Sequence, residues 1–338
     1  MDYISGEILT PNGFKTGYIG FEKQTIIEAG NTMPPKKPIC KGLIVPTFIN
    51  AHTHIGDSFI RDKNIDLPKN VEELVAPPNG LKHRLLKDAS EKDIVNGMKQ
   101  SIEVMINSGT SCFCDFRENG IQGINQLKNA VKNKSISEFI LSRPANLEYN
   151  KEEVDILLSN SNGIGLSSIS DWDYSELEKI SKHTKKNNKI FAIHASERIR
   201  EDIDMVLDLK ADFLIHMVKA SESDLTIVKE NNIPIVLCPR SNSHFGLKPN
   251  LGLMKKIGVE ILLGTDNAML NSPNVLDELK FLNDTTDIYS LEQLLNMITF
   301  TPRKVLNLSL CILGPITPAD FIVLDKNTLK TLYISRVK

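Results

Sequence analysis

The sequence is poor in the features that mark secreted, membrane-bound or nucleic-acid-binding proteins. Its 338 residues include only five cysteines, an odd and scattered set without a CxxC pair, which argues against a disulfide framework and favours a reducing, cytoplasmic compartment. The net charge of −2 provides no basic surface for a polyanion, so nucleic acid is not an expected partner. No apolar run approaches the roughly 18 residues of a membrane span, and the N-terminus lacks a signal-peptide pattern. We therefore expect a cytoplasmic protein that binds neither nucleic acid nor membrane.

Histidine is also scarce, with seven in the chain, and two of the seven stand close together. Residues 44–56 (IVPTFINAHTHIG) begin as an apolar, β-branched run of strand length and end in His52 and His54. Alternate residues of a strand point to the same side, so the two imidazoles would be presented together where the strand gives way to a loop. Two imidazoles suit a divalent transition metal, which would need further ligands from elsewhere. The alternative is that one histidine packs and the other is solvated.

The rest of the chain alternates between helical and strand patterns. A helical pattern over residues 90–107 is followed by an apolar strand pattern, and the alternation repeats to about residue 306. Together with the strand at 44–54, the pattern predicts seven further strands, at 110–116, 138–142, 163–169, 189–194, 212–216, 233–238 and 259–264. Such alternation predicts a parallel sheet, and eight units of this length predict a closed (β/α)8 TIM barrel. An open, doubly wound sheet is the alternative, although no GxGxxG follows any strand.

Both ends of the chain have strand patterns of a different kind. Residues 1–43 have short strand patterns separated by glycine and proline turns, and residues 313–338 are again strand-like and not helical. We therefore predict an α/β protein with a small β domain, built from residues 1–43 plus 313–338, and a barrel domain over residues 44–312. The polar segment from His54 to about Gly80 is predicted to be a lid or substrate loop, with disorder as the alternative.

Residues suited to metal binding and proton transfer stand at the carboxyl ends of the predicted barrel strands, where the working residues of this architecture lie. The fifth strand ends in His194 and is followed by Glu197, the sixth ends in His216, and the eighth leads into Asp266. One such histidine could be a core residue hydrogen-bonded to the backbone, but four at strand ends, together with an aspartate, indicate a site. Two other histidines lie in helical or loop contexts and are expected at the surface: His83 and His183.

Five motifs, in order along the chain, resemble those of a known family. PTFINAHTH at the first strand, HASE after the fifth, a lone histidine after the sixth, CPRSN after the seventh and LGTDNAMLNS after the eighth are similar to motifs of the amidohydrolase superfamily. The resemblance spans roughly residues 40–325 and is greatest to the cytosine deaminase-like branch, which includes S-adenosylhomocysteine deaminases, guanine deaminases and triazine chlorohydrolases. It implies one divalent metal with four ligands and a pair of proton-handling residues. The implied ligands are His52, His54, His194 and Asp266, and the implied pair is Glu197 and His216.

The chemistry of these residues agrees with what the resemblance implies. Three imidazoles and a carboxylate leave a position for water on the metal, which is expected to be zinc, with iron or manganese as alternatives. Asp266 and His216 could take the proton of that water as it attacks the ring carbon, while Glu197 protonates the neighbouring ring nitrogen and ammonia leaves. We therefore predict a deaminase of a small nitrogen heterocycle of the purine, pterin or pyrimidine type. The alternatives are ring opening of a cyclic amide, as in imidazolonepropionases, and a barrel that binds a ligand without catalysis.

The sequence departs from the family pattern at the end of the fourth strand. The segment LSSISDWD there has no histidine, whereas nucleoside-deaminating relatives usually carry one near this point. This difference argues against S-adenosylhomocysteine as the substrate. The segment has no lysine either, which argues against a carboxylated-lysine bridge and a second metal. Relatives of this type are often homodimers, and a homodimer is compatible with the sequence.

The chain has few arginines, and three of them follow other predicted strands. Arginine prefers planar contact with a carboxylate or phosphate, so these side chains would suit a negatively charged group on the substrate. The alternative is that each pairs with a nearby acidic residue or braces a loop. Trp172, the only tryptophan, could stack on a heterocycle or pack against the lid. The residues predicted to bind the substrate are Arg117, Arg143, Trp172, Arg240 and Asn242 of the CPRSN motif.

Overall fold

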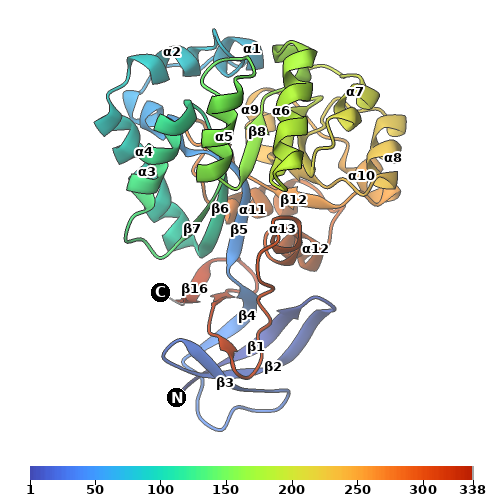
Figure 1. Ribbon diagram of the computed structural model, residues 1–338. Helices are drawn as coiled ribbons and strands as arrows, with labels where there is room; N and C mark the ends of the chain where they lie inside the picture. The colour runs from blue at the N-terminus through green and yellow to red at the C-terminus, as the bar shows by residue number, and fades with distance from the viewer. Residues whose placement is uncertain (337–338) are drawn as a thin grey trace.

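The computed structural model describes residues 1–336, in which helices surround a curled parallel sheet and a second sheet lies at one end (Figure 1). This mixed α/β architecture agrees with the predicted class. The strands of the curled sheet follow the order β12-β11-β10-β9-β8-β7-β6-β5-β13. Their bounds are β5 (Phe48–His54), β6 (Thr110–Arg117), β7 (Ser137–Ser142), β8 (Gly163–Leu166), β9 (Ile190–Ala195), β10 (Phe213–His216), β11 (Ile235–Leu237), β12 (Ile261–Leu263) and β13 (Asp266–Asn267).

The two outermost strands of this row are neighbours in the sequence. Only Gly264 and Thr265 separate β12 from β13, yet β12 pairs with β11 and β13 pairs with β5, at opposite ends of the row. The sheet therefore closes on itself. In a closed parallel sheet the carboxyl ends of all strands gather at one rim, which is where side chains from distant parts of the chain can meet.

Helices connect successive strands and cover the outside of the sheet (Figure 1). The longest, α3, shows how the sequence sets their limits: the Ser90 side chain accepts a hydrogen bond from the first turn, and Gly109 ends the helix at a φ of 100°. Its inward residues recur at helical spacing and are buried, namely Ile94, Met98, Ile102 and Met105. Within residues 1–336, no helix combines the length and apolar character needed to cross a bilayer.

The helices have the following bounds. The α-helices are α1 (Val71–Leu74), α2 (Leu81–Asp88), α3 (Glu91–Ser108), α4 (Gly120–Val131), α5 (Lys151–Asn160), α6 (Tyr174–Lys186), α7 (Ile203–Asp208), α8 (Glu222–Glu230), α9 (Pro239–His244), α10 (Leu251–Ile257), α11 (Val275–Thr285), α12 (Leu291–Asn296) and α13 (Phe300–Val305). The 3-10 helices are η1 (Ile55–Lys63) and η2 (Ile169–Asp171).

The second sheet takes strands from both ends of the chain, and its first and last strands in sequence, β1 and β16, both lie at this end of the molecule (Figure 1). In its centre β1 pairs with β4 in parallel, and β15 pairs with β4 in antiparallel orientation. The order is β14-β3-β2-β1-β4-β15-β16. The bounds are β1 (Asp2–Thr10), β2 (Gly13–Glu22), β3 (Thr25–Gly30), β4 (Cys40–Pro46), β14 (Thr317–Pro318), β15 (Phe321–Leu324) and β16 (Thr331–Ser335).

The run predicted as one strand from residue 44 is divided between the two sheets. β4 ends at Pro46 in the second sheet and β5 begins at Phe48 in the closed sheet, so the prediction was wrong about the first residues of the run. Thr47 lies at the crossing, where its hydroxyl donates a 2.6 Å hydrogen bond to Asp320. Periodicity could not reveal the division, because the residues on both sides of it are apolar and buried.

Residues 291–306 have a continuous helical pattern, but they form two helices, α12 and α13. Pro302 lies in the first turn of α13, where a missing N–H does no harm, whereas in one continuous helix it would leave the carbonyl of Ile298 unpaired. That carbonyl instead accepts a hydrogen bond of 2.8 Å from the N–H of Ile49, on a barrel strand. The break therefore ties this segment to the closed sheet.

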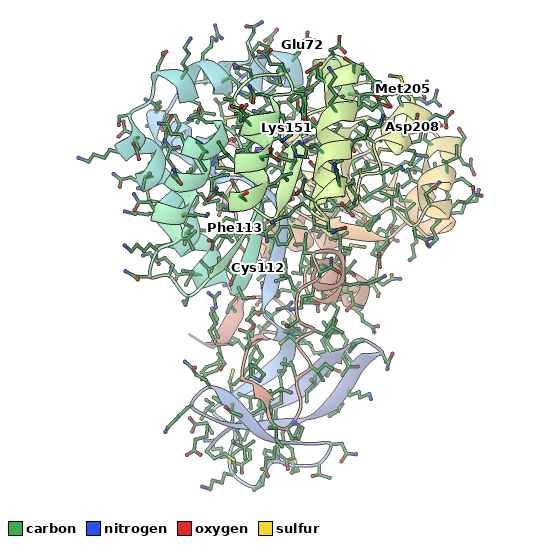
Figure 2. All side chains as sticks on the ribbon, viewed as in Figure 1. Glu72, Cys112, Phe113, Lys151, Met205 and Asp208 are labelled. Atoms are coloured by element: carbon green, nitrogen blue, oxygen red, sulfur yellow. The ribbon has the colours of Figure 1, made fainter. Side chains whose placement is uncertain are left out.

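The segment predicted as a lid or loop, from His54 to about Gly80, contains η1 and α1, and α2 follows it directly. α1 and α2 lie at the end of the closed sheet opposite the second sheet (Figure 1). Figure 2 places Glu72 of α1 at that end, while Cys112 and Phe113 of β6 lie toward the other. The segment therefore covers the rim at which the parallel strands end, and we refer to residues 64–90 as the cover.

Candidate active site

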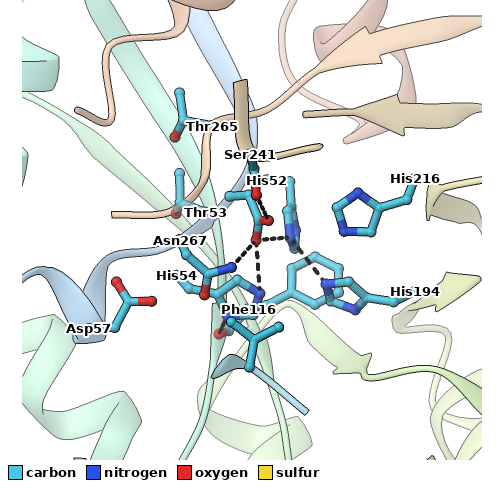
Figure 3. Close-up of polar contacts among 12 residues, drawn as sticks. His52, Thr53, His54, Asp57, Phe116, His194, His216, Ser241, Thr265 and Asn267 are labelled. Carbon is cyan, nitrogen blue, oxygen red and sulfur yellow. Dashed lines mark hydrogen bonds and ion pairs between the residues drawn. The ribbon is translucent and has the colours of Figure 1, made fainter. Parts of the chain in front are cut away.

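Four side chains from three strands meet at the rim beneath the cover (Figure 3). His52 and His54 come from β5, His194 from β9 and Asp266 from β13. The Nε2 atom of His52 lies 3.2 Å from Nε2 of His194 and 3.3 Å from Oδ1 of Asp266. Nε2 of His54 lies 3.6 Å from the same oxygen. The structure thus brings together the four residues predicted to bind a metal, with one ligand atom of each within 4.8 Å of the others.

These separations fit a single metal ion. Nitrogen and oxygen ligands that lie about 2.0–2.1 Å from zinc stand roughly 3.3 Å apart at tetrahedral angles. Two of the three outward-facing ring nitrogens have backbone partners: Nδ1 of His194 lies 2.7 Å from the carbonyl of Leu166, and Nδ1 of His54 lies 3.1 Å from that of Phe116. Nδ1 of His52 is buried without a hydrogen-bond partner among residues 1–336. An imidazole that donates from Nδ1 presents the lone pair of Nε2. The arrangement can therefore hold one divalent cation.

Burial keeps these ligands in the states that bind a cation. It lowers the pKa of His54 to about 3 and the pKa of His194 well below its ordinary value, so both rings are neutral at pH 7. Burial opposes ionisation of Asp266, but the hydrogen bond and charge of His52 and the nearby histidines hold its pKa well below the ordinary value. Neutral imidazoles and an ionised carboxylate are the forms that a divalent metal requires.

Glu197 and His216 form a second pair beside the four ligands. Oε1 of Glu197 lies 3.4 Å from Nε2 of His216, and both side chains have an atom within 4.8 Å of Asp266. Burial, together with the negative charges of Asp266 and Asp171, raises the pKa of Glu197 well above its usual range. Burial also lowers the pKa of His216 to about 4. The pair therefore offers a carboxyl group that holds its proton more tightly than usual and an imidazole that is neutral at pH 7, which suit a proton donor and a proton acceptor.

His216 and Asp266 have unusual backbone conformations, with φ values of 75° and 59°. Residues other than glycine rarely adopt such angles, and those that do are concentrated at functional sites. Side chains of the CPRSN motif contact both residues: Asn242 Nδ2 lies 3.2 Å from His216 Nδ1, and the Ser241 hydroxyl donates a 2.6 Å hydrogen bond to Asp266. Asn242, predicted to bind substrate, is thus placed where it orients His216.

A cavity opens beside these groups, and it contains one of the three predicted arginines. Arg143 lines it together with Glu197, His216 and Asp266. Among residues 1–336, no side chain forms a hydrogen bond or ion pair with the Arg143 guanidinium. A second cavity of about 580 Å³ adjoins the first and shares Arg143 with it. Arg143 is therefore a cation available to a ligand that occupies either cavity.

The other predicted substrate-binding residues lie outside the first cavity, in contact with protein groups. Arg117 is almost fully buried and pairs with Glu118 at 2.6 Å. Arg240 pairs with the buried Glu278 at 2.7 Å. Trp172 packs in the hydrophobic core, where its indole N–H donates to a serine hydroxyl. For Arg117 and Arg240, the alternative stated above therefore applies, because each pairs with an acidic residue of the protein.

Three residues of the cavity wall were not predicted from the sequence. His83 was predicted at the surface, but it lines both cavities and its Nε2 lies 3.0 Å from the carbonyl of Val75, so that prediction was wrong. Lys82 and Glu118 also line the first cavity and form a 2.6 Å ion pair. Glu118 directly follows β6, a strand-end position that could have revealed it. Lys82 gave no such signal, because α2 lies outside the alternating pattern.

The chain has relatives among known proteins. The family model described as the amidohydrolase family matches residues 43–336. An uncharacterized protein of Methanocaldococcus jannaschii is 39% identical and is aligned over 79% of this chain and 74% of its own. The 5'-deoxyadenosine deaminase of Methanococcoides burtonii is 26% identical, over 85% and 73% of the two chains. The solved structure of Helicobacter pylori aminofutalosine deaminase in complex with methylthio-coformycin has the same fold, with a TM-score of 0.75, 16% identity and 100% of both chains covered.

Proposed function

The chain belongs to the amidohydrolase family, and from this we propose that it removes an amine group, as ammonia, from a small nitrogen heterocycle of the purine, pterin or pyrimidine type. It is a metal-dependent hydrolase that acts on carbon–nitrogen bonds. The observation that carries the proposal is the pairing of Glu197 with His216 at the edge of the four-ligand cluster. A protonated acid beside a metal site is what expulsion of ammonia from a ring carbon requires. The deaminase named among the relatives supports the same reaction.

The metal would be held by His52, His54, His194 and Asp266. Three nitrogen donors and one oxygen donor suit zinc, with iron and manganese as alternatives. When bound, a divalent ion in such a site lowers the pKa of a water molecule toward neutrality and so supplies a nucleophile. The absence of a lysine at the fourth strand end supports one ion and not two.

The chain's own groups move the protons. Glu197, whose pKa is raised by burial, donates a proton to the ring nitrogen next to the carbon under attack. Asp266 and the neutral imidazole of His216 accept the proton that water releases, since both lie within reach of the same point. Asn242 orients the His216 ring through its Nδ1 atom. The hydrogen then passes to the departing amine, which leaves as ammonia.

The substrate carries a negative charge away from the reacting carbon. Arg143 supports this part of the proposal, because its guanidinium faces the cavity and has no partner among the side chains of residues 1–336. A carboxylate or phosphate would match its planar donors. Arg117, Arg240 and Trp172 are left out of the proposal, since each already has a partner within the protein.

An ammonia-release screen tests the proposal. The purified chain is loaded with zinc and incubated with purine, pterin and pyrimidine amines, with and without a carboxylate or phosphate substituent. We expect stoichiometric ammonia from at least one anionic member of the panel and none from the matching hydroxy compounds. Opening of a cyclic amide without ammonia would replace the proposal with the ring-opening reaction.

A further inference from the structure

A buried lysine lies beside the metal ligands without being one of them. Lys82 of α2 is only 2% exposed. Its Nζ atom lies 2.6 Å from Oε1 of Glu118, 2.9 Å from Oδ1 of Asn267 and 3.5 Å from Oδ2 of Asp57. The asparagine accepts a hydrogen bond and the two carboxylates form ion pairs, and the three residues come from the end of β6, from β13 and from η1. Burying an ammonium group is unfavourable unless its charge and hydrogen bonds are matched, so a lysine held by three separate elements calls for an explanation.

Two of these three residues contact candidate metal ligands directly. Oε1 of Glu118 lies 2.9 Å from Nδ1 of His54, the ring nitrogen that faces away from the other ligands. The amide nitrogen of Asn267 donates a 2.9 Å hydrogen bond to Oδ1 of Asp266, the oxygen that lies nearest the histidines. Lys82 is therefore connected to two of the four candidate ligands, each through one intermediate residue. Glu118 connects it to His54, and Asn267 connects it to Asp266.

We propose that Lys82 is a positioning residue for the metal site, which holds Glu118 against His54 and Asn267 against Asp266. Groups that support metal ligands fix the orientation of those ligands, and their removal typically changes metal affinity or activity by about 10–100-fold. Lys82 belongs to the cover, so through it the cover and the metal site are mechanically connected. The inference rests on the metal site of the proposed function but not on which substrate is hydrolysed.

The direction of the effect distinguishes positioning from charge. A fixed positive charge near the site repels a divalent cation. If Lys82 acted only by its charge, Lys82→Met would strengthen metal binding. If Lys82 positions the ligands, the same substitution weakens binding, because Glu118 and Asn267 lose the group that holds them in place.

The experiment measures metal binding by the full-length chain. Zinc dissociation constants come from competition with a chromophoric chelator, and the visible spectrum of the cobalt-loaded protein reports ligand geometry. We expect Lys82→Met and Glu118→Gln each to raise the zinc Kd about 10–100-fold and to change the cobalt spectrum. The double variant should raise the zinc Kd by less than the product of the two single effects, because Lys82 and Glu118 act on His54 through the same contact. Lys87→Met, at an exposed position of the same helix, is the matched control and should change neither readout.

An unchanged or tighter zinc Kd for Lys82→Met, with an unaltered cobalt spectrum, overturns the inference. A purely structural ion pair would lower only the melting temperature of the metal-free protein. Should Lys82→Met fail to fold, Lys82→Gln and Glu118→Gln carry the same comparison. A wild-type chain that binds one zinc but releases ammonia from no amine would refute the proposed reaction and leave this inference standing.

Discussion

A carboxyl group can donate a proton at pH 7 only where its surroundings disfavour the ionised form. Glu197 is in such surroundings, with a side chain only 13% exposed and close to the negative charges of Asp266 and Asp171. Asp266 in the same cavity has the opposite environment, because three histidines surround it and favour its anion. The two carboxyl groups are thus suited to different tasks, one as proton donor and the other as ligand and proton acceptor.

Replacement of Glu197 by glutamine tests this division of roles. Gln cannot supply a proton, so Glu197→Gln should keep its zinc while kcat falls about 10²–10⁴-fold. Zinc content by elemental analysis and steady-state ammonia release measure the two quantities. Glu178→Gln, at a half-exposed surface ion pair on α6, is the control and should match wild type. Near-normal turnover by Glu197→Gln would remove this residue from the mechanism.

Arg143 allows a second prediction at the residue scale. Arg143→Ala should raise KM for a carboxylated or phosphorylated substrate by roughly ten- to a hundredfold, since a charge-assisted hydrogen bond contributes on the order of 1.5–3 kcal/mol. A neutral analogue should be affected much less, and kcat should change little for either compound. Equal losses for the charged and the neutral substrate would show that Arg143 supports the cavity wall and does not read charge.

Among the helices, α8 shows how a single carboxylate can stabilise an element. Asp224 completes a capping box with Ser221 at the start of the helix and accepts two 2.7 Å hydrogen bonds from Arg200. The Arg200 hydrogen bond is the largest cause that lowers the pKa of Asp224, from 3.8 to about 2. A carboxylate whose pKa is lower in the folded state stabilises the fold fully at pH values above its unfolded-state pKa. That contribution is lost as the pH falls to and through its folded-state pKa.

Asp224→Asn should therefore destabilise the chain by about 0.5–2 kcal/mol near pH 7. The difference from wild type should shrink between about pH 4 and pH 2, as Asp224 becomes protonated in the unfolded and then in the folded state. Urea unfolding followed by circular dichroism at several pH values measures it. Glu222→Gln, an exposed residue of the same helix, serves as the control. A difference that does not depend on pH would show that the charge is not what stabilises the cap.

At the scale of the whole molecule, the chain passes between two sheets at Thr47 and returns to the second sheet near its C-terminus. The Thr47 hydroxyl and the carboxylate of Asp320 join the two crossings by a 2.6 Å hydrogen bond. The division into a terminal β domain, residues 1–43 plus 313–338, and a barrel domain, residues 44–312, stays a prediction, as does the homodimer.

Metal binding should raise the stability of the whole fold, because the candidate ligands lie on three strands that are far apart in sequence. A ligand at about 100 times its Kd stabilises the folded state by about 2.7 kcal/mol, which for a chain of this length raises Tm by roughly 4 °C. Chelation should reverse the shift, and His52→Ala should abolish it. We expect one zinc per chain by elemental analysis. Two tightly bound ions per chain would contradict the four-ligand site.

The sequence by itself determined the class of the protein and most of its candidate site. Hydrophobic periodicity is local, so the alternation of helices and strands could be read directly, and the amidohydrolase resemblance drawn from five motifs was confirmed. The strand ends could also be listed in order, because parallel strands in one sheet present their carboxyl ends on the same side. His52, His54, His194 and Asp266 stand at such strand ends and could be identified from the sequence as candidate ligands.

Only the tertiary structure decided which residues contact and support those candidate ligands. Lys82 reaches Glu118 and Asn267 across separations of 36 and 185 residues, and no local pattern encodes such contacts. The same holds for the change of sheet at Thr47. Buried apolar residues lie on both sides of it, but the strand before it pairs in the second sheet and the strand after it pairs in the closed sheet. Arg143 and Arg117 look alike in the sequence, since each follows a strand. Glu118 directly follows Arg117 in the chain, but only the structure shows that the two side chains pair, at 2.6 Å, while Arg143 lines the cavity.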